Sequence, residues 1–351
     1  MKVGMVIGAL EGGGMGTVVD SLLGELKKKG IEVEIITKKL LVAPPKGVKV
    51  HLVKTTSLGT TKMLEKFDVV HVNGGSLLTL PAAFAKVPKI FTFHGQTPPE
   101  MHGGHVRHAK ALAIEMLYRA MMRKFDVIAS TSRFGQEDIR KRYGIGKSIW
   151  IPNGVERKMF HKVSNGKVKR IREKYSHPLL LGVGSLYAVK GWEFMLDCFE
   201  ELLKRERNAT LLIAGDGVQE KELKRRVEGS KLRGHVVFLG KVNLKDLNDY
   251  YNACDLYVSG SPYEGFCLPA VEALACGKPI CVRKKGAMTE HALLSGCGTV
   301  FEKKEEFAGK ALEALGMPAK EIGIRSEKYL GPFSWEKVAG RYAEVYRSMV
   351  K

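Results

Sequence analysis

Two glutamates, Glu264 and Glu272, stand with seven residues between them where an apolar run gives way to a helical pattern. The run Leu256–Val258 is typical of a buried strand, and Pro269 suits the first turn of a helix, because the N–H that proline lacks is not needed there. We therefore expect a helix to begin near Leu268. Its free amides and its dipole favour an anion, such as a phosphate, at the helix start.

The spacing of the two glutamates bears on the chemistry. A glycoside hydrolase flanks one bond with carboxyl groups roughly 5 Å apart in retaining enzymes and roughly 6.5–9.5 Å apart in inverting ones. Glutamates eight positions apart across a loop and a helix do not favour such a facing pair. They favour two separate contacts with hydroxyl groups, one at each end of a ligand whose diphosphate lies over the helix start. On the pair alone, an ordinary strand-loop-helix unit with two surface glutamates stays open.

A glycine-rich loop, Gly12–Gly16, follows the first expected strand and would let the backbone approach a phosphate, with Gly14 and Gly16 as candidate contacts. The loop lacks the Gly-x-Gly-x-x-Gly spacing of dinucleotide-binding proteins, and the second strand ends at Thr37-Lys38 instead of an acidic residue. NAD binding is therefore disfavoured. A tight turn without a ligand is the alternative.

Two further candidates follow apolar runs. His94 comes directly after the expected strand Ile90–Phe93, where a histidine either contacts a ligand or simply satisfies local hydrogen bonds. Lys190 lies in the glycine-rich segment Gly182–Gly191 and could neutralise a diphosphate, although lysines before helices are also frequent on surfaces.

Apolar strand-like runs alternate with helical patterns along the whole chain, which is typical of parallel βαβ units and an α/β fold. The polar stretch Asn153–Lys169 separates two such series, so we expect two Rossmann-like domains. The expected strands are Val3–Ile7, Val33–Ile36, Val69–Val72, Ile90–Phe93, Val127–Ala129 and Ser148–Ile151, then Leu179–Val183, Thr210–Ala214, Val236–Leu239, Leu256–Val258 and Pro279–Val282.

The charge and the composition of the chain narrow the classes of partner that it could bind. The net charge is +20, and residues 1–160 carry 25 Lys and Arg against 13 Asp and Glu, which favours anionic partners. Nucleic-acid binding lacks support, since neither zinc-finger spacing nor an RNP-like strand occurs.

No apolar run approaches the roughly 18 residues that a spanning helix needs, and the N-terminus enters a strand, so we expect a cytoplasmic protein. The six cysteines form no CxxC pair, and no disulfide framework is indicated.

The sequence also predicts no metal centre. It contains no Asp-x-Asp pair, and His102, His105 and His108, although spaced by three, lack a fourth ligand pattern. The basic, amphipathic segment Val106–Lys124 favours a helix packed on the core over a membrane or acceptor surface.

The segment Glu264–Gly277 resembles the Glu-x7-Glu motif of the family-four retaining glycosyltransferases of the GT-B fold. Ile151–Val155 resembles the interdomain signature of that family, and Phe333–Tyr346 its terminal helix. The resemblance implies two Rossmann-like domains facing across a cleft. The first would comprise residues 1–155 with a C-terminal helix, 334–351, crossing back onto it, and the second residues 156–333.

The resemblance also implies roles for the candidate residues. Glu272 would hold the ribose of a nucleotide sugar, and Glu264 the hydroxyls of the sugar. His94 would contact the transferred sugar or the acceptor. The phosphate and base contacts would come from Lys190, the loop glycines Gly14 and Gly16, the segment Gly184-Ser185, the base-binding strand end at Gly240, and the amides of Gly265, Phe266, Cys267 and Leu268.

The chain departs from the family pattern at two positions. Ser185 stands where related enzymes usually carry an arginine beside the lysine, and Val18 where a histidine is often found. A basic residue of the segment Arg283–Lys285 is a candidate substitute for that arginine.

The expected function is retaining transfer of a hexose-type sugar from a nucleotide diphosphate sugar to an acceptor hydroxyl, without a cofactor or metal. The acceptor would be lipid-linked, a polysaccharide or a small sugar. A GT-B sugar-nucleotide epimerase and a non-catalytic sugar- or anion-binding protein remain alternatives. The basic stretch Arg107–Arg142 adds the hypothesis of peripheral contact with anionic lipid at the inner membrane face.

Overall fold

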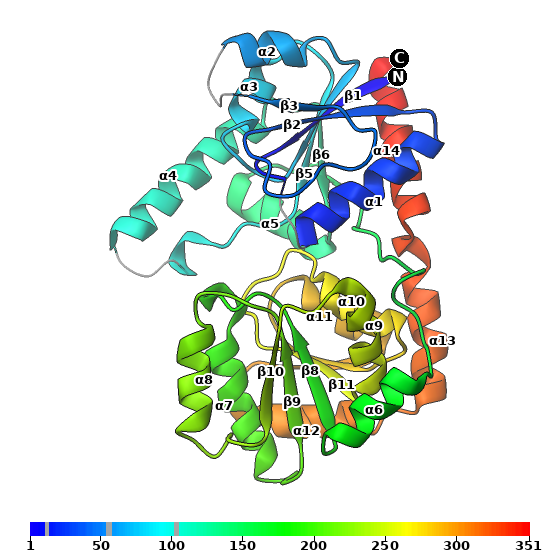
Figure 1. Cartoon of the computed structure of the whole chain (residues 1–351). Helices are drawn as coiled ribbons and strands as arrows, with labels where there is room; N and C mark the ends of the chain where they lie inside the picture. The colour runs from blue at the N-terminus through cyan, green and yellow to red at the C-terminus, as the bar shows by residue number, and fades with distance from the viewer. Residues whose placement is uncertain (11–13, 54–57, 102–104) are drawn as a thin grey trace. The chain divides into compact units, whose positions relative to one another are not determined.

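The computed structural model describes residues 1–10, 14–53, 58–101 and 105–351. The chain divides into two compact units, one formed by residues 1–154 together with 332–351 and the other by residues 155–331 (Figure 1). Each unit is a parallel sheet covered by helices, as the alternating pattern predicted.

In the first unit, seven described strands pair in the order β3-β2-β1-β4-β5-β6-β7, all parallel. The strands are β1 (Lys2–Ile7), β2 (Glu32–Thr37), β3 (Val50–Leu52), β4 (Val69–Asn73), β5 (Lys89–Phe93), β6 (Val127–Ser130) and β7 (Ile149–Trp150). The helices are α1 (Gly14–Lys28), α2 (Leu58–Leu64), α3 (Thr79–Phe84), α4 (His105–Met122), α5 (Arg133–Tyr143) and α14 (Trp335–Val350), with the 3-10 turn η1 (Pro99–Met101).

In the second unit, six described strands pair in parallel in the order β10-β9-β8-β11-β12-β13. They are β8 (Leu179–Val183), β9 (Thr210–Ala214), β10 (Val236–Gly240), β11 (Leu256–Ser259), β12 (Ile280–Arg283) and β13 (Gly298–Phe301). The helices are α6 (Gly166–Lys174), α7 (Trp192–Leu203), α8 (Glu220–Glu228), α9 (Leu244–Ala253), α10 (Leu268–Ala275), α11 (Ala287–Ser295), α12 (Lys304–Leu315) and α13 (Ala319–Leu330), with the 3-10 turn η2 (Ala188–Lys190). The 3-10 turn η3 (Gly331–Phe333) stands where the chain passes from the second unit back to the first.

The strand order reverses direction once in each sheet, between β1 and β4 in the first unit and between β8 and β11 in the second. At such a switch point the two loops leave the carboxyl ends of adjacent strands in opposite directions, and open α/β sheets bind ligands there. Strands buried on both faces read as continuous apolar runs, which is why these strands were recognisable in the sequence.

The last helix returns to the first unit. In Figure 1 α14 lies beside α1, and its Tyr346 hydroxyl is 2.7 Å from Nδ1 of His71 on β4. Tyr342 on the same helix bonds Thr92 on β5, with 3.0 Å between the hydroxyl oxygens. The expected packing of the terminal helix on the first domain is therefore confirmed.

Every expected strand is present, but β3 and β13 were not expected. Both lie at a sheet edge, and they are short: three residues in β3 and four in β13. Edge strands are buried less completely, so their apolar signal in the sequence is weak.

The expectation of a core-packed helix over Val106–Lys124 is wrong for most of its length. On α4 the side chains of Leu112, Met116 and Leu117 are exposed, and among the residues of this helix whose side chains are described, Met121 and Met122 are the buried ones. Hydrophobic periodicity identifies an apolar face without saying what covers it. Within the described chain, no helix combines the length and the apolar character needed to cross a bilayer.

Candidate functional site

Two predicted residues meet at the switch point of the second sheet. Lys190 ends the 3-10 turn after β8, Glu264 lies in the loop after β11, and Lys190 Nζ is 2.7 Å from Glu264 Oε1. Burial opposes the charge of Lys190, but the Glu264 carboxylate outweighs that effect and the net pKa of Lys190 is raised. A lysine that stays charged and a carboxylate therefore stand side by side at the edge where a ligand is expected.

The start of α10 lies in the same loop. As predicted, α10 begins at Leu268 with proline in its first turn, and its N-cap residue is Cys267. Cys267 has a φ of 69° and is the one described residue other than glycine in the left-handed region. Such strain persists where the surroundings enforce it, and it concentrates at ligand sites. In the described structure the amides of Cys267 and Leu268 have no hydrogen-bond partner, so they are available to an anion.

A buried histidine holds this loop, and the sequence did not single it out. His291 on α11 bonds the carbonyl oxygen of Phe266 through Nε2 and the hydroxyl of Tyr329 through Nδ1. Burial lowers the pKa of His291 to about 4, so the ring is neutral near pH 7. A carbonyl only accepts, hence Nε2 carries the proton and Nδ1 accepts from Tyr329.

Glu272 lies in the second turn of α10 with only 8 % of its surface exposed. Tyr251 on α9 donates its hydroxyl hydrogen to Glu272 Oε2 across 2.7 Å. Burial raises the pKa of Glu272 to about 7, and the bond from Tyr251 offsets part of that rise. Tyr251 was missed because nothing in the local sequence relates it to a residue twenty-one positions away.

Glycines let the strand ends of this sheet pack closely. A Cβ on Gly215, which has a φ of 153°, would clash with the carbonyl oxygen of Gly184. Gly240, at the end of β10, has a φ of 66° and its carbonyl accepts from the Gly215 amide at 2.8 Å. The predicted glycines Gly184 and Gly240 therefore line the carboxyl edge, together with Gly215, which was not predicted.

At Ser185, where related enzymes usually carry an arginine, the backbone makes the observed contact. The Ser185 carbonyl oxygen accepts from Nε1 of Trp192 at 2.9 Å. Of the candidate substitutes, Lys284 pairs with Glu302 at 3.2 Å, and the Arg283 guanidinium lies over the Phe194 ring at 4.0 Å. The Lys284 side chain is thus held by Glu302, and the Arg283 side chain by Phe194.

His94 lies at the corresponding edge of the first sheet. Its Nε2 bonds Oδ1 of Asn73, the last residue of β4. Burial lowers the pKa of His94 to about 4. The ring is thus neutral near pH 7, and because an amide oxygen only accepts, Nε2 carries the proton. Nδ1 has no partner in the described part of the chain and can accept from a ligand hydroxyl.

The glycine-rich loop is described only in part. Gly12 and Gly13 lie outside the described residues, and α1 begins at Gly14 and includes Gly16. Of the histidines considered as metal ligands, His102 also lies outside them, and His108 bonds the carbonyl of Pro99 through Nδ1 at 3.0 Å. Among the residues that are described, no group of three or more His, Cys, Asp or Glu could hold a metal ion.

Two family models match the chain. The model described as "Glycosyltransferase Family 4" matches residues 12–158, and the model "Glycosyl transferases group 1" matches residues 166–327. Together they cover most of both units.

Curated relatives are identical to this chain at a quarter or more of the residues that align. Mannosylfructose-phosphate synthase of Agrobacterium fabrum is 29 % identical over 235 residues, which are 64 % of this chain and 48 % of that protein. Alpha-monoglucosyldiacylglycerol synthase of Streptococcus pneumoniae is 26 % identical over 309 residues, 82 % of this chain and 69 % of that protein. The chain thus spans about half the length of the first relative and about seven tenths of the second.

Solved structures share the fold across the whole chain. Sucrose-phosphate synthase of Thermosynechococcus elongatus superposes with a TM-score of 0.82 at 20 % identity, covering 99 % of this chain and 98 % of that one. Anabaena HepE, solved with UDP and glucose, gives 0.81 at 17 % identity, with 99 % and 100 % covered. The motif, the two matching models and the shared fold agree, and the chain belongs to the family-four glycosyltransferases with the GT-B fold of two Rossmann-like domains.

Proposed function

We propose that the protein is a retaining glycosyltransferase that moves a hexose-type sugar from a nucleotide diphosphate sugar to an acceptor hydroxyl. The observation that carries this proposal is the ion pair of Lys190 and Glu264 beside the start of α10, the helix that also holds Glu272. A cation, free helix amides and two carboxylates are what a diphosphate with a sugar at each end requires. The names of the relatives, both synthases of glycosyl compounds, support the reaction class.

In this proposal the second unit binds the donor. Lys190 and the amides of Cys267 and Leu268 hold the diphosphate and stabilise the charge that grows on it as the sugar leaves. Glu264, held by Lys190, accepts hydrogen bonds from the sugar hydroxyls. Glu272 accepts from the ribose with the carboxylate oxygen that Tyr251 does not bond.

Retention would follow from attack on the same face that the leaving group departs from. The bond between the sugar's anomeric carbon and the diphosphate breaks through an oxocarbenium-like state. The acceptor oxygen bonds that carbon, and its proton passes to the leaving diphosphate. The neutral His94 accepts a hydrogen bond from a hydroxyl through Nδ1, which helps align the substrates. Lys190 and the helix dipole supply the positive charge, so we propose that no metal is needed.

A thermal-shift panel of UDP-glucose, GDP-mannose and ADP-glucose tests donor binding. A ligand at a hundred times its dissociation constant stabilises the protein by about 2.7 kcal/mol. The donor that binds is then incubated with acceptors, with and without EDTA, and the anomeric configuration of the product is read by NMR.

We expect transfer with retained configuration that survives EDTA. Loss of transfer with EDTA and recovery with Mg²⁺ or Mn²⁺ would overturn metal independence. A new sugar nucleotide formed from the donor alone would favour the epimerase alternative. Binding without turnover would favour the non-catalytic alternative.

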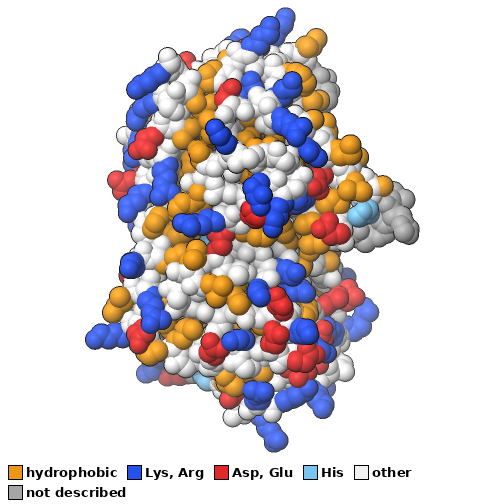
Figure 2. All heavy atoms as spheres, turned by 180° about the vertical axis from the view of Figure 1, so that it is seen from behind, with side chains coloured by type: hydrophobic (Ala, Val, Ile, Leu, Met, Phe, Trp, Pro, Cys, Tyr) orange, Lys and Arg blue, Asp and Glu red, His pale blue; other side chains and the backbone are white. Residues whose placement is uncertain are grey.

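We also propose peripheral contact with anionic membrane, on the cytoplasmic side. Figure 2 shows Lys and Arg side chains spread over the displayed face without one dense patch, so charge alone does not choose a surface. The support comes from α4, where exposed Met116 and Leu117 share a helix with Arg107, Lys110 and Arg119. Co-sedimentation with phosphatidylglycerol vesicles should be strong at low salt and weak at 1 M, where the Debye length falls to about 3 Å. No binding at low salt would remove this part of the proposal.

A further inference from the structure

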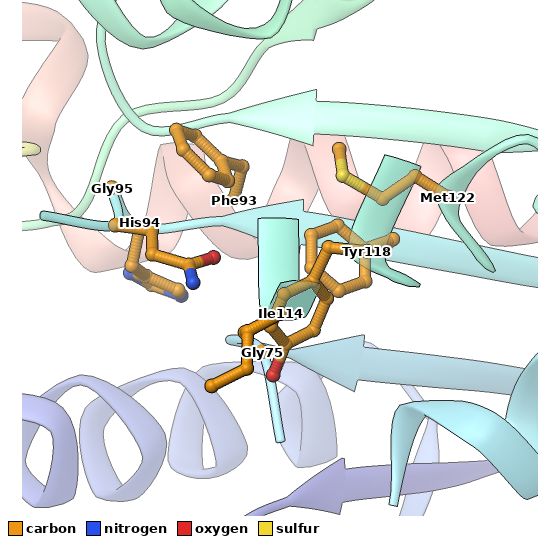
Figure 3. A pocket seen from close by; sticks show the side chains of 9 residues that line it. Gly75, Phe93, His94, Gly95, Ile114, Tyr118 and Met122 are labelled. Atoms are coloured by element: carbon orange, nitrogen blue, oxygen red, sulfur yellow. The ribbon is translucent and has the colours of Figure 1, made fainter. Parts of the chain in front are cut away.

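A pocket of about 230 Å³ opens beside His94 in the first unit. In Figure 3 His94 and Gly95 lie on one side of it, and Ile114, Tyr118 and Met122 of α4 on the other. Its remaining lining residues are Gly75, Phe91, Phe93 and Gln96. The pocket therefore lies between the carboxyl ends of β4 and β5 and helix α4.

Five of the nine residues that line the pocket carry apolar or aromatic side chains. Ile114, Tyr118 and Met122 recur every four residues and so share one face of α4. Phe91 and Phe93 of β5 line it from the sheet. Such walls favour apolar ligand groups, and each methylene buried strengthens binding by about fourfold.

The position of α4 over the pocket is held by a half-buried arginine. Arg142 on α5 donates to Oε2 of Glu115 on α4 at 3.0 Å and to the Gln96 carbonyl oxygen at 2.7 Å. The helix and the loop after β5 are thus tied to one side chain, and the pocket is a formed feature of this unit.

Two side chains offer the pocket hydrogen-bonding groups that have no partner among the described residues. One is His94 Nδ1, and the other is the Tyr118 hydroxyl, which no described residue bonds. Burial raises the pKa of Tyr118 to about 12, so this hydroxyl keeps its proton and can donate. The third polar residue, Gln96, already accepts from Tyr143 at its side-chain oxygen, across 3.2 Å.

This set of groups does not suit a sugar ring. A hexose carries several hydroxyls, and burying one without a partner costs about as much as a lost hydrogen bond. One hydroxyl attached to a hydrocarbon matches two polar groups among apolar walls. The exposed apolar residues Leu112 and Leu117 lie on the same helix outside the pocket, where the rest of a chain could continue.

We infer that this pocket binds the acceptor through an acyl or alkyl chain, with the hydroxyl that receives the sugar lying between His94 and Tyr118. The inference rests on the proposed function and names the acceptor class: a lipid alcohol. The chain enters between Phe93, Ile114 and Met122, and Tyr118 donates to the hydroxyl oxygen while His94 accepts its hydrogen.

The pocket also depends on a glycine. A Cβ at Gly75 would come within 2.8 Å of the Tyr118 ring, so any larger residue would push that ring into the pocket. The tyrosine can therefore lie flat against the loop after β4 only because residue 75 has no side chain.

Binding of 1-O-alkylglycerols with butyl, hexyl and octyl chains tests the inference, with glycerol and glucose as chain-free probes. Affinities are measured by calorimetry below the micelle concentration, on the full chain and without nucleotide sugar, so that no transfer to the probe takes place. The variant is Ile114→Glu and the matched control is Met116→Glu. Ile114 lines the pocket and is 37 % exposed, and Met116, on the same helix, is 72 % exposed and does not line it.

We expect the affinity of the wild-type protein and of Met116→Glu to rise about fourfold per methylene, and Ile114→Glu to lose most of that rise. Glucose binding as tightly as octylglycerol, or a rise that Met116→Glu loses as much as Ile114→Glu does, would overturn the inference. The thermal shift caused by the nucleotide sugar should be equal in all three proteins. If that shift is absent from the wild-type protein, it is the proposed function that fails, and the chain-length series still reports on the pocket.

Discussion

Glu272 combines a buried position with a proposed role as a charged ligand contact. Its carboxyl group accepts one hydrogen bond from Tyr251, and burial raises its pKa to about 7. The charged form therefore costs stability in the absence of donor. Residues that serve binding at the expense of stability are common at functional sites.

We predict that Glu272→Gln weakens nucleotide-sugar binding by about 1.5–3 kcal/mol, because a hydrogen bond to a charged group is lost. The same change should stabilise the free protein at pH 8. The folded pKa of about 7 lies above the ordinary value of 4.5, so the stability this group contributes is present below pH 4.5 and lost as the pH rises through 7. Calorimetry and thermal unfolding at pH 5 and pH 8 check both effects. Unchanged affinity would remove Glu272 from the site.

Tyr251 is expected to orient that carboxylate. Tyr251→Phe keeps the ring, which packs edge-on against Phe160 at 5.7 Å, and removes only the hydroxyl. We predict about tenfold weaker nucleotide-sugar binding and a pH dependence of binding moved to higher pH, because the bond that lowers the Glu272 pKa is lost. Burial, and to a smaller extent the nearby Cys254 and Glu272, raise the pKa of the Cys276 thiol.

The control for Tyr251→Phe is Tyr257→Phe. Tyr257 is also a fully buried tyrosine of the second unit, but its hydroxyl bonds Cys267 Sγ at 3.7 Å and not Glu272. Its loss should leave the pH profile in place. Equal displacement of the profile in both variants would mean that general loosening of the core, and not orientation of Glu272, is responsible.

At the scale of elements, the carboxyl edge of the second sheet depends on close approach of loops. The turns after β8 and β9 touch at Gly184 and Gly215, and a Cβ on Gly215 would clash with the carbonyl oxygen of Gly184.

We predict that Gly215→Ala destabilises the protein by about 1–3 kcal/mol, because the added Cβ meets the Gly184 carbonyl and the φ of 153° suits only glycine. The matched control is Gly309→Ala in α12, where a Cβ meets nothing within 4 Å. That change should stabilise by about 0.5–1 kcal/mol through helix propensity. Urea unfolding of both variants measures the difference, and similar effects in both would contradict the role of the contact.

At the scale of the whole molecule, three buried histidines make the stability of both units depend on pH. Burial lowers the pKa to about 3 in His71, and to about 4 in His94 and His291. His71 and His94 belong to the first unit, and His291 to the second. Each is neutral in the folded protein and charges more readily when the chain unfolds.

We predict that thermal stability falls as the pH drops from about 6.5 to about 4. A histidine whose folded pKa is lowered contributes stability that is present above its ordinary pKa of 6.5 and lost as the pH falls toward the folded value. Glu272 acts in the opposite direction over part of this range, but one group opposes three. Scanning calorimetry at pH 7, 6, 5 and 4 follows the loss. His291→Gln should flatten it more than His161→Gln, a change at an exposed position of the same unit, and equal slopes would contradict the assignment.

Local pattern was sufficient for much of this molecule. Apolar runs bounded by turns identified the long strands, and proline after a strand identified the start of α10 at Leu268, because both signals depend on neighbouring residues. The motif around Glu264 and Glu272 indicated the family. The edge strands β3 and β13 and the exposure of α4 could not be predicted, since both depend on what covers an element.

The contacts that make the candidate sites were decided only by the tertiary structure. Lys190 meets Glu264 across 74 positions of sequence, and Tyr346 meets His71 across 275. Tyr251 reaches Glu272 in the same way, from another helix. Strand order and helix packing bring such partners together, and neither can be read directly from the linear sequence. Residue types therefore indicated which chemistry was available, and the topology of the two sheets decided which groups share a site and what charge each one carries.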